Sequence, residues 1–270
     1  MAKHALKHMT WVEFRERLAE KPVILLPFAS QEEQGPHAPM GDWMVTEELS
    51  IRTAERAGAV AAPTMPFGWA DFFRAVPGGI ALRPETFKAV LLDVCDNFLA
   101  HGLDHLVIFN GHSSNYPLID QATRAIKRER GVAIPCLNIW QIMPASFWKE
   151  IHGDRAAAAR GHGGDPLTSA YHHLMPELMR NDLLATAAPK RAYGLPSAGV
   201  NAVNFDGVTV NLPLDVTEAT ANGIISGDPH LSSPEIGARI CEFVVETSAR
   251  FVRHWRECNP RDPAAAVAVD

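Results

Sequence analysis

The sequence has few cysteines, no excess of basic residues and no long apolar segment, and each shortage excludes a class of protein. Its four cysteines stand at positions 95, 136, 241 and 258 of 270 residues, without a Cys-x-x-Cys pair. This spacing argues against a zinc ribbon or a disulfide framework and favours a reduced, cytoplasmic setting. A formal net charge of -6 leaves no basic footprint for a phosphate backbone, so nucleic acid is not an expected partner.

No segment predicts a membrane span, an export signal or a nucleotide-binding loop. The first residues lack the apolar centre of a secretion signal. The charge-free stretch 131–148 is interrupted by Pro135, Asn138, Gln141 and Pro144, which predict a strand and a polar turn instead of a spanning helix. Neither a Gly-x-Gly-x-x-Gly run nor a Gly-Lys phosphate loop follows a strand-like segment, which disfavours a nucleotide-binding α/β domain.

Apolar, strand-like runs alternate with helical patterns along the chain. The runs cover 23–28, 59–62, 105–109 and 132–139. This alternation predicts an α/β fold, a single domain with a mostly parallel sheet flanked by helices. Helices are expected from Pro84 to Gly102, over 115–130, from Asp165-Pro166 onward and over 234–257, with loops and short strands over 193–228. We expect the domain to span 1–258 and a loose tail to follow over 259–270.

The most informative segment is the polar loop over residues 32–42, which directly follows the first apolar run. The carboxyl ends of parallel strands are where α/β proteins hold ligands. His112 also follows a strand, at a glycine turn before a helix whose positive end disfavours a charged imidazole. Carboxylates with an imidazole suit zinc, manganese or iron, so Glu32, Asp42 and His112 are candidate ligands. The same two acids could instead be solvated loop residues.

Five segments together resemble the creatininase family of metal-dependent hydrolases. They are residues 32–42, 78–87, 110–115, 161–169 and 227–229, which extend over nearly the whole chain. The resemblance implies a creatininase-like fold in which Glu32, Asp42 and His112 bind metal. It implies that His162 is a catalytic general acid or base, although a packed loop histidine is the alternative. It further implies a small cyclic substrate and a homo-oligomer, in many members a hexamer.

Three more residues are candidates for metal or substrate contacts. Gln34 occupies a position where many family members have a histidine for a second metal, and an amide is a poor ligand for transition metals. His37 could bind metal or brace its loop, and Asp165 could bind metal or cap the following helix. Ser114 and Leu167 stand where members often carry glutamate. We therefore expect one tightly bound zinc, manganese or iron ion.

The expected function is the opening of a small cyclic substrate by hydrolysis. The bound metal would lower the pKa of water from about 15.7 toward about 7, and the resulting hydroxide would attack a carbonyl. His162 would protonate the leaving atom. The bond could belong to a cyclic amide or a formamide. Two alternatives are a ring-opening carbon–carbon hydrolase of a diketo-inositol, of the 3-dehydro-scyllo-inosose type, and a non-catalytic binding protein on the same fold.

Overall fold

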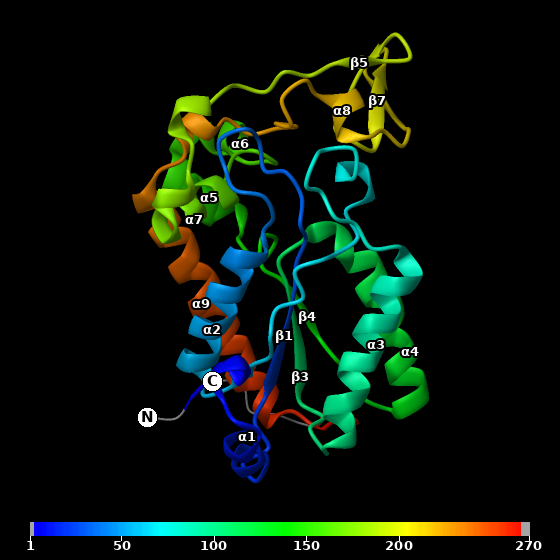
Figure 1. Cartoon of the computed structure of the whole chain (residues 1–270), viewed down its shortest axis with the longest axis vertical. Helices are drawn as coiled ribbons and strands as arrows, with labels where there is room; N and C mark the ends of the chain where they lie inside the picture. The colour runs from blue at the N-terminus through cyan, green and yellow to red at the C-terminus, as the bar shows by residue number, and fades with distance from the viewer. Residues whose placement is uncertain (1–2, 266–270) are drawn as a thin grey trace.

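A computed structural model describes residues 3–265 and places a four-stranded parallel sheet at the centre of the molecule (Figure 1). The strand order is β2-β1-β3-β4, with β1 at Ile24–Phe28, β2 at Val60–Ala61, β3 at Leu106–Asn110 and β4 at Cys136–Asn138. In the register of the central pair, Phe28 lies opposite Asn110. The carboxyl ends of β1 and β3 are therefore adjacent, and the expected α/β fold with a mostly parallel sheet is confirmed.

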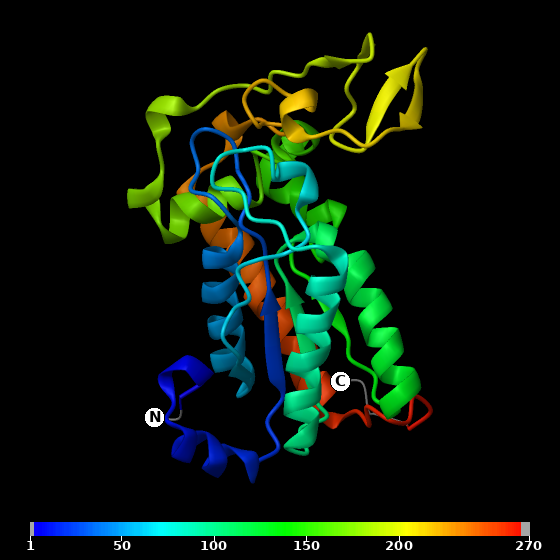
Figure 2. The ribbon, with the colours of Figure 1, turned by 45° about the vertical axis from the view of Figure 1, so that its right-hand side comes forward.

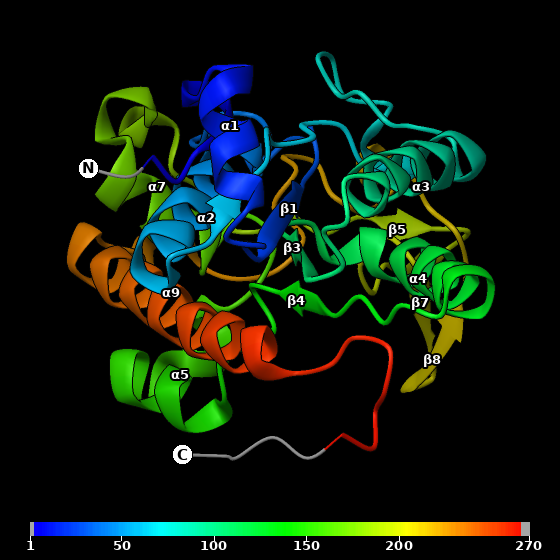
Figure 3. The same ribbon diagram turned by 90° about the horizontal axis from the view of Figure 1, so that it is seen from below.

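Helices cover both faces of the sheet (Figures 1 and 3). Helices α2 (Trp43–Ala57) and α9 (Pro234–Glu257) lie on one face, and α3 (Pro84–Ala100) and α4 (Tyr116–Arg130) lie on the other. Alternate residues of β1 point to opposite faces, so Leu26 packs with the α3 and α4 cluster while Leu25 packs with α2 and α9. Burial on both faces explains why this strand is apolar throughout.

The helix boundaries follow the expected signals closely. Pro84 occupies the first turn of α3, and Ser233 caps α9 by accepting the N–H of Ile236 at 3.2 Å. The helix expected from Asp165-Pro166 starts one residue later, because α7 spans Leu167–Leu174. Asp165 lies outside the helix and its carboxylate accepts the N–H of Ser169 at 3.0 Å, as a capping residue does.

The remaining elements extend the sheet domain at its two ends. They are α1 (Trp11–Leu18), α5 (Ala145–His152), α6 (Ala156–Ala159), β5 (Arg191–Ala192), β6 (Leu195–Pro196), β7 (Ala202–Phe205), β8 (Val208–Asn211) and α8 (Val216–Ala219). Short 3₁₀ helices lie at Leu6–His8, Asp71–Phe73, Ser113–Asn115, Gly153–Arg155, Pro176–Leu178, Asn181–Leu183 and Pro229–Leu231. The short strands expected over 193–228 are confirmed, and β7 and β8 form a projecting hairpin (Figure 2). Helix α5 was not expected: the stretch 131–148 ends in its first turn.

The structure bears on two further expectations, which concern a membrane span and the tail after residue 258. Within residues 3–265, no helix combines the length and the apolar content that crossing a membrane requires. Residues near the start of the expected tail contact the domain, because Pro260 accepts the N–H of Ala133 and Arg261 Nη1 donates to the carbonyl of Arg130, both at 2.8 Å. The last part of that tail, 266–270, lies outside the described residues, so the boundary at 258 stays a prediction.

Candidate metal centre

A tight loop between β1 and α2 brings Glu32 and Asp42 together. The N–H of Gly41 donates to the carbonyl of Glu32 at 2.6 Å, and the N–H of Asp42 donates to the carbonyl of Ser30 at 3.3 Å. Gly41 has a φ of +90°, and a Cβ there would lie 2.7 Å from the Ser30 carbonyl oxygen, so this turn needs glycine. Asp42 is then oriented by Ser30, whose N–H donates to Oδ1 at 2.7 Å.

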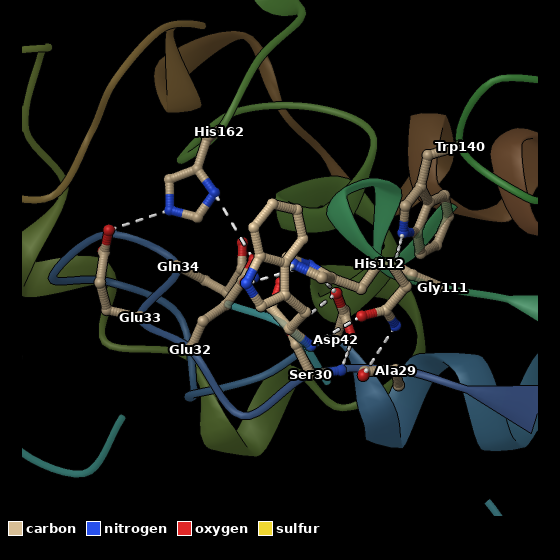
Figure 4. A network of polar contacts seen from close by, with 12 residues as sticks. Ala29, Ser30, Glu32, Glu33, Gln34, Asp42, Gly111, His112, Trp140 and His162 are labelled. Atoms are coloured by element: carbon tan, nitrogen blue, oxygen red, sulfur yellow. Dashed lines mark hydrogen bonds and ion pairs between the residues drawn. The ribbon is translucent and has the colours of Figure 1, made fainter. Parts of the chain in front are cut away.

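His112 reaches the same point from the neighbouring strand. The Asn110 side chain holds the turn after β3, because its Nδ2 donates to the carbonyl of His112 at 2.7 Å. Gly111 lies so close to α2 that a Cβ there would fall 1.8 Å from Thr46 Oγ1. Ligand atoms of Glu32, Asp42 and His112 all lie within 4.8 Å of one another (Figure 4). The structure therefore brings the three predicted ligands together.

The hydrogen bonds of His112 leave the correct nitrogen facing the two acids. Its Nε2 lies 3.2 Å from the carbonyl oxygen of Trp69, which can only accept, so Nε2 carries the proton. Whenever the imidazole is neutral, the lone pair is therefore on Nδ1, which lies 3.0 Å from Glu32 Oε2 and 3.3 Å from Asp42 Oδ2. Among the described residues, Glu32 Oε2 has no well-aligned hydrogen-bond donor. Three lone-pair donors that face one another fit a cation.

The electrostatics of the three groups agree with this geometry. Burial alone would lower the pKa of His112, but Glu32 and Asp42 raise it to about 10. Burial raises the pKa of Asp42 to about 6, although the hydrogen bond with His112 opposes this. For Glu32, burial is outweighed by His112, and the pKa is lowered. Without a cation, two buried carboxylates thus share one imidazolium, and a divalent ion would balance their charge by displacing its proton.

His162 and Gln34 lie beside the three ligands. His162, in the loop between α6 and α7, places Nδ1 3.8 Å from Glu32 Oε1 and Nε2 2.9 Å from Glu33 Oε1. Burial alone would lower the pKa of His162, but the bond with Glu33 and the charge of Glu32 raise it. Gln34 Nε2 donates to Glu32 Oε1 at 2.8 Å. The amide therefore orients a candidate ligand through its donor group.

The other two candidates make contacts that stabilise loops. His37 is fully buried, and its Nε2 lies 3.1 Å from Thr168 Oγ1. Because that hydroxyl donates to the carbonyl of Gly163, His37 must donate to it. Asp165 uses both carboxylate oxygens, since Oδ1 accepts from Ser169 and Ser232 and Oδ2 lies 2.9 Å from His152 Nε2. Asp165 nevertheless lines the cavity described below.

The burial of His37 gives the protein a testable acid sensitivity. Burial, assisted by the charges of His172 and His230, lowers the pKa of His37 from 6.5 to about 4. Between these two pH values His37 is protonated in the unfolded chain but neutral in the folded chain, so the free energy of unfolding is highest above the unfolded pKa and falls as pH decreases through this window. From pH 7 to pH 5, the free energy of unfolding of His37→Gln should decrease by about 2 kcal/mol less than that of the unchanged protein, as measured by urea unfolding with chelator present. Equal losses would contradict the assignment.

A cavity of about 350 Å³ opens onto the candidate metal centre. Its walls combine the three ligands, His162 and Gln34 with aromatic and apolar side chains: Phe72, Phe73, Trp140, Val200 and Ile225. Ser113, Ser114 and Asn201 add polar groups that could hydrogen-bond a ligand. A larger cavity of about 620 Å³, between α2 and α9, shares none of these residues, and its charged lining includes the ion-paired Arg52, Arg56 and Glu242. The smaller cavity is therefore the candidate active site.

The fold and the cluster define an α/β protein with a candidate metal centre at the carboxyl edge of its sheet. The sequence model of the family described as creatininase, creatinine amidohydrolase, matches residues 7–252. The chain belongs to the creatininase family.

The curated relatives that the sequence matches are hydrolases. A 3-dehydro-scyllo-inosose hydrolase of Thermotoga maritima is 25% identical over 186 residues, which span 67% of this chain and 60% of that protein. The match thus covers less than two thirds of the relative. A mycofactocin precursor peptide peptidase of Mycobacterium ulcerans is 26% identical over 246 residues, 87% of this chain and 86% of the relative.

Solved creatininases share the fold. A structure described as creatininase Mn and a variant complexed with creatine each superpose with a TM-score of 0.75 at 25% identity, over 93% of this chain and 98% of theirs. A second structure of that variant, of the Zn-Zn type, gives the same TM-score and identity over 94% of this chain. These likenesses connect the chain with proteins that are described with manganese or zinc.

Sequence reasoning missed three groups that shape the centre. Glu33 belongs to the polar loop over residues 32–42, but the sequence alone indicates no role for it. The carbonyl of Trp69, which fixes the tautomer of His112, belongs to a loop without a motif. Ser30, two residues beyond the apolar run, orients Asp42. The acidity of Glu33 was the only available signal, because a backbone carbonyl and a lone serine carry none.

Proposed function

We propose that this chain is a metal-dependent hydrolase that holds one zinc, manganese or iron ion between Glu32, Asp42 and His112. One observation carries the proposal: with Nε2 bonded to Trp69, the Nδ1 lone pair of His112 faces carboxylate oxygens of Glu32 and Asp42 at 3.0 and 3.3 Å. Three acceptors at this distance repel one another unless a cation or an extra proton lies between them. The mixture of imidazole and carboxylate suits these metals.

The residues around the ion divide the remaining tasks. When bound, the ion supplies a Lewis acid that acidifies water and polarises a carbonyl. Nδ1 of His162 faces the cavity, where it can take a proton from the attacking water and return it to the leaving atom. Phe73 stacks on the His162 ring at 4.5 Å, which fixes its plane. Apolar walls limit the water that competes for these protons.

We further propose that the chain holds a single ion. Gln34, which stands where many relatives have a histidine, donates its amide to Glu32 Oε1. That oxygen is then already engaged in a hydrogen bond. Ser114 lines the cavity with a hydroxyl where relatives often carry a carboxylate. Neither side chain offers the anionic or imidazole donor that a second transition metal needs.

The substrate we propose is a small cyclic amide or a formamide. A cavity of about 350 Å³ fits a molecule of this size. The ring-opening hydrolysis of a diketo-inositol is the second candidate, favoured by the match to an inosose hydrolase and by the polar Ser113, Ser114 and Asn201. In that reaction the hydroxyl of water adds to one carbonyl carbon, the adjacent carbon–carbon bond breaks, and the departing carbon takes the proton.

Assembly and compartment complete the proposal. Tyr193, Phe205 and Val208, on and beside the projecting hairpin, are 80%, 54% and 61% exposed, which supports a homo-oligomer. We propose a hexamer because the family resemblance implies one. The cysteines of the described chain are free thiols, which supports a cytoplasmic location.

Chelation followed by stepwise restoration of metal tests the proposed hydrolase. A panel of cyclic amides, formamides and inositol-derived diketones is first screened for a substrate that the protein turns over. Protein stripped with a chelator should turn this substrate over at least about 100-fold more slowly. About one equivalent of Zn²⁺, Mn²⁺ or Fe²⁺ should restore its turnover. A mock-treated sample that keeps its metal is the control. Undiminished turnover after complete stripping would contradict the proposal, and ligand binding without turnover in metal-loaded protein would identify a non-catalytic binding protein.

A further inference from the structure

Glu33 is a buried carboxylate that does not join the three candidate ligands. It is 7% exposed and points away from Glu32, toward His162 (Figure 4). Its Oε1 lies 2.9 Å from His162 Nε2, and its Oε2 accepts the N–H of Gly35 at 2.6 Å. Gly223 packs against the carboxylate so closely that a Cβ there would lie 2.2 Å from Oε2. Glu33 is thus held in one position.

The His162 ring is held on its other sides as well. Phe73 stacks on one face with an interplanar angle of 26°. The backbone is anchored because the carbonyl of His162 accepts N–H groups of Ile225 and Ser226, both at 3.2 Å. With the ring plane and the backbone fixed, the remaining freedom is which nitrogen carries the proton. That choice decides what the ring offers to the cavity.

We propose that Glu33 is a positioning residue for His162, whose carboxylate accepts the Nε2–H and so directs the lone pair of Nδ1 into the cavity. The inference rests on the proposed function, in which Nδ1 moves the proton. A carboxylate offers acceptors and no donor, so it pairs with a protonated Nε2 and disfavours the other tautomer. It also stabilises the imidazolium that forms while the ring holds the proton.

Glu33→Gln separates the two tautomers without changing the size of the side chain. The amide has one acceptor and one donor group, whereas the two groups that contact the Glu33 carboxylate, the N–H of Gly35 and the Nε2–H of His162, both donate and each need an acceptor. The backbone N–H of Gly35 cannot change, so the amide oxygen should pair with it and leave the NH₂ facing His162. The proton of His162 should then move to Nδ1. In Glu33→Ala no acceptor faces Nε2, and a mixture of tautomers is expected.

Long-range ¹H–¹⁵N NMR of the neutral imidazole, on zinc-loaded full-length protein with ¹⁵N-labelled histidine, reports the tautomer directly. His162→Ala assigns the signal. We expect Nε2–H in the unchanged protein, Nδ1–H in Glu33→Gln and a mixture in Glu33→Ala. In both variants kcat should fall about 10- to 100-fold with little change in KM, a part of what proton transfer supplies. An unaltered Nε2–H tautomer in both variants would overturn the proposal, whatever their rates.

Controls separate this inference from the proposed hydrolase. Glu48→Gln changes an exposed glutamate that pairs with Arg52, and it should leave both the tautomer and kcat unchanged. Zinc content should stay the same in all variants. If the tautomer shifts while no substrate of the panel is turned over, the positioning role stands and the hydrolase proposal fails. If turnover is metal-dependent but the tautomer does not respond to Glu33, the positioning role alone fails.

Discussion

Replacing His112 with alanine should remove the metal from this protein. The variant loses the only imidazole of the proposed ligand set, and its two remaining ligands, Glu32 and Asp42, are buried carboxylates that repel each other. Loss of a group that merely supports a ligand costs about 10- to 100-fold in metal affinity, so loss of a ligand should cost more than about 100-fold. A competition titration of Zn²⁺ against a chromophoric chelator measures this change.

His105→Ala is the matched control for that titration. His105 precedes β3 and His112 follows it, so the two histidines stand at opposite ends of one strand. His105 is half-buried and lies 2.9 Å from the carbonyl of Cys258, away from the cavity. Its replacement should leave zinc affinity unchanged. Equal zinc affinity in His112→Ala and the unchanged protein would rule out the proposed centre.

The second large effect concerns His162. His162→Ala should lower kcat by about 10²–10⁴-fold while zinc content stays at the level of the unchanged protein, because in the proposed mechanism His162 moves a proton and does not hold the ion. Steady-state kinetics together with metal analysis of the same samples test this separation. His230→Ala, which alters an exposed histidine paired with Asp228, should leave both quantities unchanged. A His162→Ala variant with full turnover, or one that loses its zinc, would refute this role.

The fold and the three candidate ligands could be predicted because local sequence encodes them. The apolar run that became β1 and the glycine turn that follows β3 mark two carboxyl strand ends. Parallel pairing then places Phe28 opposite Asn110, which brings Glu32 and His112 to the same edge. Helix α5 was missed, since Pro144 suggested a turn and actually precedes the first helical residue, where proline is also common.

The residues that orient the candidate ligands could not be predicted, because their positions depend on contacts between loops that are distant in the sequence. Trp69 donates its N–H to the Asn115 side chain at 2.8 Å, and its carbonyl oxygen lies 3.2 Å from His112 Nε2. No local pattern announces that orientation. Whether Glu33 faces metal, solvent or His162 depends likewise on the packing of Gly223 and Phe73, which come from other parts of the chain. The sequence identifies chemical groups, whereas their directions follow from tertiary structure.

Metal content per chain tests the central claim most directly, because it needs no substrate. Protein is saturated with Zn²⁺ or Mn²⁺ and freed of excess ion by gel filtration, and its metal content is measured by elemental mass spectrometry. It should retain about one ion per chain. One ion, held by Glu32, Asp42 and His112, is what the proposed centre predicts. No retained ion with either metal would contradict a metal-dependent hydrolase, and two retained ions would contradict the single-ion centre.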